Sequence, residues 1–314
     1  MSKHRDVWPA LVYDTLAPMI QYVNRLVQIG SKYTLDEPFE PGWGAIVLEV
    51  TPRGLRTPVY RLDGHTFTVH YRLLDNDVVI ESDNGSRTLP LRTGTVAVFY
   101  ADFVAAVEEL GIDPPKSSLI CEIPGSVPRF EDDKLQRSWD PEAARTMWEG
   151  YDLVAGALEQ WQAPFLGHRP PVGVMWGGFD LSATRHRPVP TTPVAGRPAF
   201  LQNGELYEYV SVGFSLGDAA HKGAYLYAYI WPQPDGLEGR EWGVAGANWI
   251  EKEGLVVLPW NALRATDDPH AAVVDFGNAV YEAAVATAGW PANLIGPVCD
   301  GWHMSTTHPT GHPR

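Results

Sequence analysis

The chain has 314 residues, of which 45% are hydrophobic and 20% charged, as is usual for a globular protein. Its formal net charge of −14 argues against nucleic-acid binding, because neutralising phosphates requires an excess of Lys and Arg, and it also disfavours docking on an anionic membrane. No apolar run approaches the ~20 residues of a membrane helix, and the N-terminus has no targeting pattern.

The two cysteines indicate the cellular compartment in which the protein is expected. Cys121 and Cys299 are far apart in the sequence and lack the spacing of a metal or redox motif. Such sparse use favours a reducing compartment, with a single bridge between the two thiols as the alternative. We therefore expect a cytoplasmic protein.

The first part of the chain predicts a helix, four short strands and a second helix. Apolar residues recur at helical spacing from 16 to 28, and Gly30 is the expected end of that helix. Strands are expected at 45–50, 66–73 and 78–82, and Asn84 with Gly85 is a strong signal for a hairpin into the next strand. An amphipathic helix follows from Val96 to Leu110.

The second part repeats this order after a linker at 113–139. Asp140 as N-cap and Pro141 at the first helical position predict a helix start. Strands are expected at 172–176 together with 179–183, at 206–214, at 224–231 and at 255–258. Asp268 and Pro269 then begin a closing helix that Gly289 is expected to end.

This order predicts an α+β fold of two pseudo-repeated helix–four-strand–helix halves that share antiparallel sheet, with the helices packed on the sheet. The first half with its linker spans 1–138, the second half 139–295 and a C-terminal tail 296–314, within one globular unit. The groove between two such halves is a natural ligand site. No Gly-rich phosphate loop opens either long helix, which removes the two commonest nucleotide-binding folds.

Asp180 is the first candidate for chemistry. It stands in an expected strand, where Asp is disfavoured, on the face shared by Ser182 and Thr184, with Arg185 just beyond. The carboxylate either binds or activates a substrate, or it is held in an ion pair with Arg185 or in a bond to a loop amide.

Glu208 is the second candidate, because counting by twos places it on an otherwise apolar face of its strand. A buried carboxylate must be paired, protonated or turned toward a polar cavity. Desolvation would raise its pKa toward neutrality, which suits a general acid or base. A structural ion pair is an equally good interpretation.

Aromatic residues supply a candidate wall. Tyr225, Tyr227, Tyr229 and Trp231 form one stripe of the strand 224–231, which suits either a ligand-lining surface or a central strand covered on both sides. Tyr207, Tyr209 and Ser211 extend this wall in the first interpretation.

The histidines of the tail do not predict a metal site. His303, His308 and His312 are not at helical spacing, and Pro and Gly interrupt them, so a frayed tail is expected. We assign no metal and no cofactor.

Several segments resemble a bacterial family of unknown function, DUF5996. They include Trp8 to Tyr13, Val50 to Leu55, Glu122-Ile-Pro124, Asp140 to Ala144, Trp176 to Leu181, Glu208 with Ser211 to Phe214, and Ala228 to Gly236. The resemblance spans Trp8 to about Trp290 and implies no particular activity. It does fall on Trp176, Asp180, Arg185 and Glu208.

The chain departs from the family pattern at its histidines. The pattern has them in the first helix, around the first strand and just before the glutamate, where this chain has Asn24, Gly42, Ala45 and Tyr207. If those histidines bind metal or transfer protons in relatives, this member has lost that ability or changed its chemistry.

The leading hypothesis is a cytoplasmic enzyme acting on a small organic molecule in an aromatic-lined cavity. Glu208 and Asp180 would be its acid/base carboxylates, and Arg185 would anchor an anionic group. The remaining predicted lining residues are Trp176, Tyr207, Tyr227 and Ser211. The alternative is a non-catalytic small-molecule-binding protein with the same pocket, which the missing histidines favour slightly. Neither hypothesis involves nucleic acid or membrane, and the oligomeric state is left open.

Overall fold

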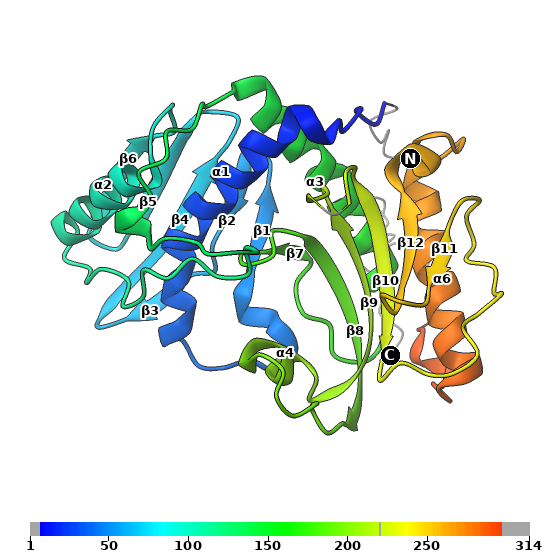
Figure 1. Ribbon diagram of the computed structural model, residues 1–314. Coiled ribbons are helices and arrows are strands. Elements are labelled where there is room, and N and C mark those ends of the chain that lie inside the picture. The colour runs from blue at the N-terminus through cyan, green and yellow to red at the C-terminus, as the bar shows by residue number, and fades with distance from the viewer. Residues whose placement is uncertain (1–6, 220, 297–314) are drawn as a thin grey trace, which may run out of the picture.

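The computed structural model describes residues 7–219 and 221–296 and shows an α+β fold built on one large antiparallel sheet (Figure 1). The strand order is β11-β12-β10-β9-β8-β7-β1-β2-β4-β5-β6, and β3 pairs with β4. The strands of the two halves join where β1 pairs with β7, with Val47 opposite Met175. The predicted α+β class with a shared antiparallel sheet is therefore confirmed.

The first half contributes α1, α2 and the strands β1 to β6. Their bounds are α1 Tyr13–Ser31, β1 Val47–Thr51, β2 Gly54–Arg56, β3 Tyr60–Leu62, β4 His65–Arg72, β5 Asp77–Ser82, β6 Gly85–Pro90 and α2 Val96–Glu109. Three 3₁₀ helices lie in its connections: η1 Lys32–Asp36, η2 Pro41–Ile46 and η3 Phe130–Asp132.

The second half contributes α3 to α6 and the strands β7 to β12. Their bounds are α3 Pro141–Gln162, β7 Gly173–Met175, β8 Leu181–Pro190, α4 Ala199–Gly204, β9 Tyr207–Ser215, β10 Tyr225–Trp231, β11 Asn248–Ile250, β12 Leu255–Pro259, α5 Trp260–Arg264, α6 Pro269–Thr287 and η4 Ala292–Leu294. The short strands β2, β3 and β11 were not predicted, and within the described residues each half holds six strands where the repeated unit was expected to hold four.

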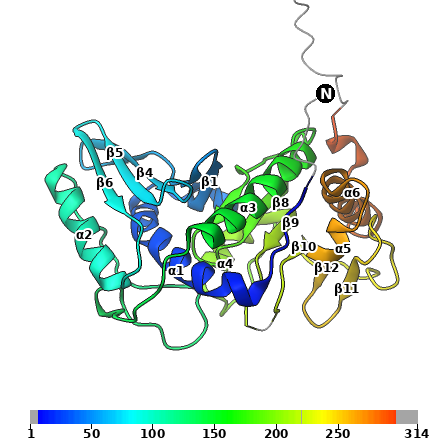
Figure 2. The ribbon, with the colours of Figure 1, turned by 90° about the horizontal axis from the view of Figure 1, so that it is seen from above.

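Helices cover the two groups of strands separately. Figures 1 and 2 place α1 and α2 over the strands of the first half, and α3 and α6 over those of the second. The predicted helix starts are confirmed, because the Asp140 carboxylate accepts from the Glu142 amide at 2.9 Å and Asp268 accepts from Ala271 at 3.0 Å. The Asn84-Gly85 hairpin is confirmed as well, with Ser82 paired to Gly85.

Gly30 has a different role from the one predicted. Helix α1 continues to Ser31, and the Gly30 amide donates to the Tyr71 hydroxyl at 3.0 Å. A Cβ on Gly30 would lie 2.5 Å from that hydroxyl oxygen. Glycine is needed here because β4 approaches the helix closely, and not because the helix ends.

The strands β8 to β10 have two faces of different character. One face is apolar and is covered by α3 and α6; its buried residues include Leu181, Ala183, Val210, Val212, Phe214, Leu226, Ala228 and Ile230. The opposite face, which we call the polar face, carries Ser182, Thr184, His186, Tyr209, Ser211, Tyr227 and Tyr229 by strand alternation and register.

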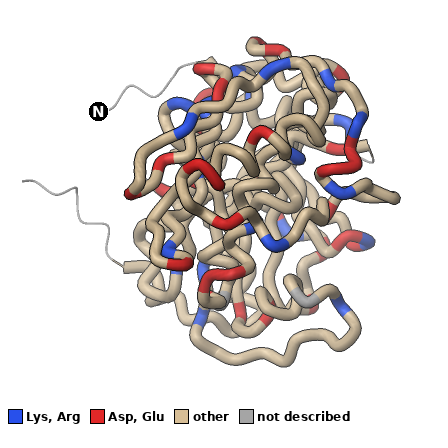
Figure 3. The backbone as a smooth tube through the Cα atoms, turned by 90° about the vertical axis from the view of Figure 1, so that its left-hand side faces the viewer, with Lys and Arg blue, Asp and Glu red and all other residues tan. Residues whose placement is uncertain are grey.

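The surface mixes both signs of charge, and Figure 3 shows acidic and basic positions interspersed over the side that it draws. Across residues 7–219 and 221–296, no helix combines the length and apolar character that crossing a bilayer requires. Cys121 has a free thiol. Cys299 and the three tail histidines lie outside the described residues.

Candidate functional site

A pocket of about 160 Å³ opens on the polar face, and we call it the carboxylate pocket. Its walls come from η2, the segment after α2, the β7–β8 turn, α4 and β10. The lining residues are Trp43, Ile46, Glu122, Met175, Gly177, Asp180, Ser182, Phe200, Leu201, Tyr227 and Tyr229.

A tight turn between β7 and β8 positions Asp180. The Met175 amide donates to the Asp180 carbonyl at 2.8 Å, and the Phe179 amide donates to the Met175 carbonyl at 2.8 Å. Phe179 has φ +62°, a conformation that a bulky residue keeps only when its surroundings impose it. The Tyr151 hydroxyl provides part of that constraint by donating to the Phe179 carbonyl at 2.7 Å.

Tyr227 reaches Asp180 across the intervening strand. Tyr227 is on β10 and Asp180 precedes β8, so the tyrosine ring must pass over β9 at Gly213. A Cβ on Gly213 would lie 2.2 Å from the ring, so only glycine leaves this path open. The Tyr227 hydroxyl then donates to the Asp180 carboxylate.

Burial raises the pKa of the Asp180 carboxyl, and the hydrogen bond from Tyr227 opposes that rise. Burial and the Asp180 charge together raise the pKa of Tyr227 well above its usual value, so the phenol remains a donor at neutral pH.

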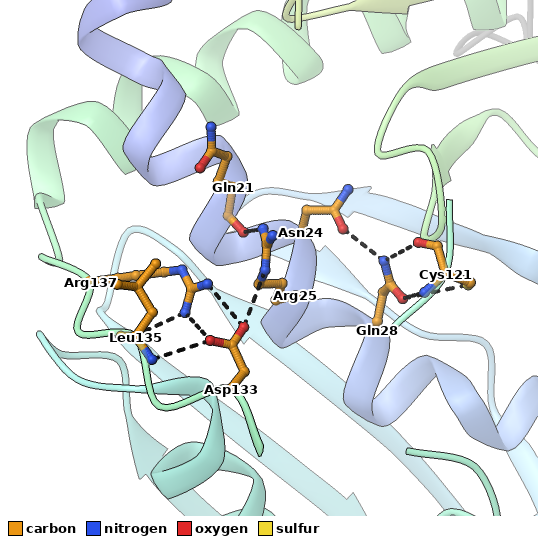
Figure 4. Close-up of polar contacts among 8 residues, drawn as sticks. All are labelled: Gln21, Asn24, Arg25, Gln28, Cys121, Asp133, Leu135 and Arg137. Atoms are coloured by element: carbon orange, nitrogen blue, oxygen red, sulfur yellow. Dashed lines mark hydrogen bonds and ion pairs between the residues drawn. The ribbon is translucent and has the colours of Figure 1, made fainter. Parts of the chain in front are cut away.

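The segment that carries Glu122 is fastened to α1 (Figure 4). The Cys121 amide donates to Gln28 Oε1 at 3.0 Å, and Gln28 Nε2 donates to the Cys121 carbonyl at 3.0 Å. Further along, the buried Asp133 carboxylate pairs with Arg137 at 2.9 Å and Arg25 at 3.3 Å. The predicted linker is therefore a structural element of the site.

Glu122 places a second carboxylate beside the first. The residue as a whole is exposed, but its carboxylate lies over Gly177, where a Cβ would be 2.0 Å from Oε1. Asn24 fixes this glycine by donating to its carbonyl at 3.1 Å. Burial, and next the neighbouring Asp180 charge, raise the pKa of Glu122, while Lys32 opposes the rise.

Lys32 supplies a positive charge that acts on Glu122. The residue is only 3% exposed, and its ammonium group is 3.4 Å from the Cys121 sulfur and 4.5 Å from the centroid of the Trp176 ring. Burial lowers the pKa of Lys32, while Cys121 and Glu122 oppose that change. Lys32 is not among the lining residues, so it influences the pocket through the effect of its charge on Glu122.

Backbone strain is concentrated around the pocket. Among the described residues other than glycine, five have positive φ, and three of them (Trp43, Glu122 and Phe179) line the pocket or precede Asp180. Residues in such conformations cluster at functional sites. The Trp43 indole donates to the Phe200 carbonyl at 2.7 Å, which joins η2 to α4 along one wall.

Two of the predicted site residues, Asp180 and Tyr227, line the pocket. Ser211 lies next to it on β9, where its hydroxyl contacts those of Ser182 at 3.3 Å and Thr184 at 3.4 Å. Trp176 is buried, and its ring faces Lys32 instead of the pocket.

Glu208 and Arg185 lie on the other face of the sheet, under the helices. Glu208 is 3.1 Å from Arg187, its partner across β8 and β9. Arg185 is 1% exposed, donates to the Trp161 carbonyl and lies with its guanidinium carbon 4.0 Å from the Trp161 ring centroid. Burial lowers the pKa of Arg185 to about 9. The structure therefore does not bring Glu208 or Arg185 to Asp180.

Tyr207 lines a second pocket of about 340 Å³ with Glu40, His168, His186, Arg187 and Pro188. Burial, and next the neighbouring His168, lower the pKa of His186 to about 3. The His186 imidazole is therefore neutral near pH 7. In the described part of the chain, no group of three or more His, Cys, Asp or Glu residues is arranged to hold a metal ion.

Glu122 is the functional candidate that sequence reasoning missed. Its signal was present in the Glu122-Ile-Pro124 segment, which carries part of the family resemblance. A family model matches residues 8–296, which include every described helix and strand. The chain belongs to DUF5996, a family of unknown function. Neither the curated proteins nor the solved structures compared with this DUF5996 chain gave a match.

Proposed function

We propose that this DUF5996 protein is an enzyme that acts on a small organic molecule in the carboxylate pocket, with Asp180 and Glu122 as its proton-transfer groups. The observation that carries the proposal is the pairing of two carboxyls, each with a raised pKa, in one strained, aromatic-lined pocket. Raised pKa values bring carboxyls closer to the range in which they exchange protons at neutral pH.

The two carboxyls differ in environment, which supports different roles. Tyr227 donates to Asp180 and so stabilises its ionised form. The Asp180 charge in turn favours the protonated form of Glu122. Asp180 is therefore the better base and Glu122 the better acid, following the general rule that neighbouring groups with separated pKa values divide these tasks.

The test is a turnover screen. Purified protein is incubated with a mixture of small metabolites, and mass spectrometry follows which compounds are consumed. Asp180→Asn and Glu122→Gln should each reduce the rate of consumption at least about 100-fold, as is typical for loss of a general acid or base. Asp102→Asn and Glu109→Gln are the matched controls, because these carboxylates are exposed and lie in α2.

The proposal fails if the rate of consumption is the same in wild type and in both pocket variants. Equal loss in the α2 controls would also contradict it, because the effect would then not be specific to the pocket.

The second candidate is a non-catalytic binding protein. Helix α1 approaches the pocket with the amides of Asn24 and Gln28, neither of which can transfer a proton at neutral pH. This candidate predicts that wild type retains a compound at one-to-one stoichiometry without changing it, and that the pocket variants release it.

The remaining expectations also stay proposals. We propose that the protein works in the cytoplasm, which is consistent with the free Cys121 thiol. Its partner would be a small molecule, and not nucleic acid or a membrane. The two halves would derive from a repeated unit.

A further inference from the structure

We infer that the carboxylate pocket takes a compact organic ammonium ion carrying a single positive charge. This inference rests on the proposed function, because it names the class of molecule that Asp180 and Glu122 would bind. It follows from the charge, the aromatic surface and the size of the pocket.

The charge of the lining is one-sided. Of the described residues that line the pocket, two are acidic and none is Lys, Arg or His. An anionic ligand would meet both carboxylates without a compensating donor cation, and a neutral ligand would leave them desolvated together. A cation between Asp180 and Glu122 relieves the repulsion that otherwise favours protonation of Glu122.

Lys32 limits the charge that the pocket accepts. Its ammonium group contacts the Trp176 ring and the Cys121 sulfur outside the lining, and its charge acts on Glu122. Two carboxylates and this one ammonium group leave a net charge of about −1 around the pocket when all three are ionised. A single positive charge on the ligand completes the balance.

Aromatic rings provide the surface that organic cations prefer. Trp43, Phe200, Tyr227 and Tyr229 all line the pocket, and the rings of Tyr227 and Tyr229 are nearly parallel, with an interplanar angle of 17°. Ammonium ions, quaternary ones especially, bind to the faces of such rings. An inorganic cation would gain less from these walls, and a divalent ion would need more oxygen ligands than two carboxylates supply.

The volume limits the size of the ligand. The pocket measures about 160 Å³, close to the ~150 Å³ cavity that accommodates benzene in another protein. Choline and tetramethylammonium fall in this range. Choline also has a neutral twin, 3,3-dimethylbutan-1-ol, in which carbon replaces the nitrogen and the shape is unchanged.

The experiment compares this matched pair of probes. Isothermal titration calorimetry at constant ionic strength measures choline, tetramethylammonium and 3,3-dimethylbutan-1-ol against the full-length protein. Choline should bind at least about tenfold more tightly than the alcohol. Glu122→Gln and Asp180→Asn should each weaken choline at least about tenfold and leave the alcohol nearly unchanged, whereas Glu109→Gln should affect neither probe.

Each other outcome overturns the inference in a recognisable way. Equal affinities for choline and the alcohol would refute the requirement for charge while leaving a small-molecule site in place. Binding of Ca²⁺ or Mn²⁺ that depends on both carboxylates, with no binding of either ammonium probe, would make the pocket a metal site. If the turnover screen finds a neutral or anionic substrate whose consumption depends on Asp180, the ammonium inference is refuted while the proposed function stands. Turnover that is independent of both carboxylates would refute the proposed function.

Discussion

Glu208→Gln distinguishes a structural carboxylate from a catalytic one. The wild-type Glu208 carboxylate lies 3.1 Å from Arg187, and the two side chains are 19% and 22% exposed. Arg187 also donates to the Gly289 carbonyl at 3.1 Å, so it keeps one partner when Glu208 becomes neutral. The variant removes the charge while conserving the shape of the side chain.

The expected loss of stability lies between two limits. Exposed ion pairs contribute about 0.2–1 kcal/mol, while removal of one partner of a buried pair costs about 3–5 kcal/mol. A pair that is about one-fifth exposed, with a remaining partner for Arg187, should therefore lose about 1–2 kcal/mol. In a chain of this length that loss lowers Tm by roughly 1.5–3 °C.

Urea denaturation of a double-mutant cycle measures this pair directly. Glu208→Gln, Arg187→Gln and the double variant should show a coupling energy of about 1 kcal/mol, because the two side chains are in contact. Ligand binding at the carboxylate pocket should be unchanged, since Glu208 lies on the other face of the sheet. Additive effects on stability together with loss of turnover would refute this assignment and restore Glu208 as a catalytic candidate.

Three further substitutions, the first with a control substitution, test the pocket and the opposite face of the sheet. Gly177→Ala should weaken ligand binding at least about tenfold in calorimetry, because the Cβ of the alanine would displace the Glu122 carboxylate. The control is Gly156→Ala, at an exposed position of α3, which should raise stability by about 1 kcal/mol and leave ligand binding unchanged. Because burial raises the pKa of Asp180, the folded protein binds more protons than the unfolded chain between the two pKa values, and stability falls as pH rises through that window. Asp180→Asn should therefore be more stable than wild type near neutral pH and equal to it below the usual pKa of aspartate. Urea denaturation at one pH in each range measures this, and a difference in stability between variant and wild type that is the same at both pH values would refute it. Arg185→Met should change the free energy of unfolding by less than about 2 kcal/mol, because the lost contacts with Trp161 are offset by removal of a buried charge. Two of the Arg185 guanidinium nitrogens have no hydrogen-bond partner among the described residues. A large loss of ligand affinity would instead support the anion anchor that the sequence predicted.

Local signals predicted much of the fold. Asp140 and Asp268 cap helices, and Asn84 with Gly85 forms a hairpin, because these preferences depend only on neighbouring residues. Gly30 shows the limit of such signals. Its lack of a side chain serves a contact with Tyr71, which is 41 positions away along the chain.

The site required information of longer range. Strand alternation does place Arg185 with Leu181 and Ala183, so its burial was within reach of the pattern. Alternation cannot, however, relate the faces of two strands before their register is known. The pairing of Arg187 with Glu208 is therefore what shows that Glu208 and Asp180 lie on opposite faces.

Glu122 was the hardest residue to predict. Its segment has no helical or strand periodicity, and contacts such as Gln28 with Cys121, separated by 93 positions, hold it in place. Nothing in the local sequence indicates that this carboxylate meets Asp180. Only the resemblance to DUF5996 drew attention to the segment.

The central claim is that Asp180 and Glu122 form one small-molecule site. Ligand-observed NMR of a small-molecule library tests it most directly, with wild type compared against the Asp180→Asn, Glu122→Gln double variant and an Asp102→Asn, Glu109→Gln control. Some compounds should bind wild type and the control but not the double variant. Compounds that bind all three proteins equally would show that the ligand site lies elsewhere.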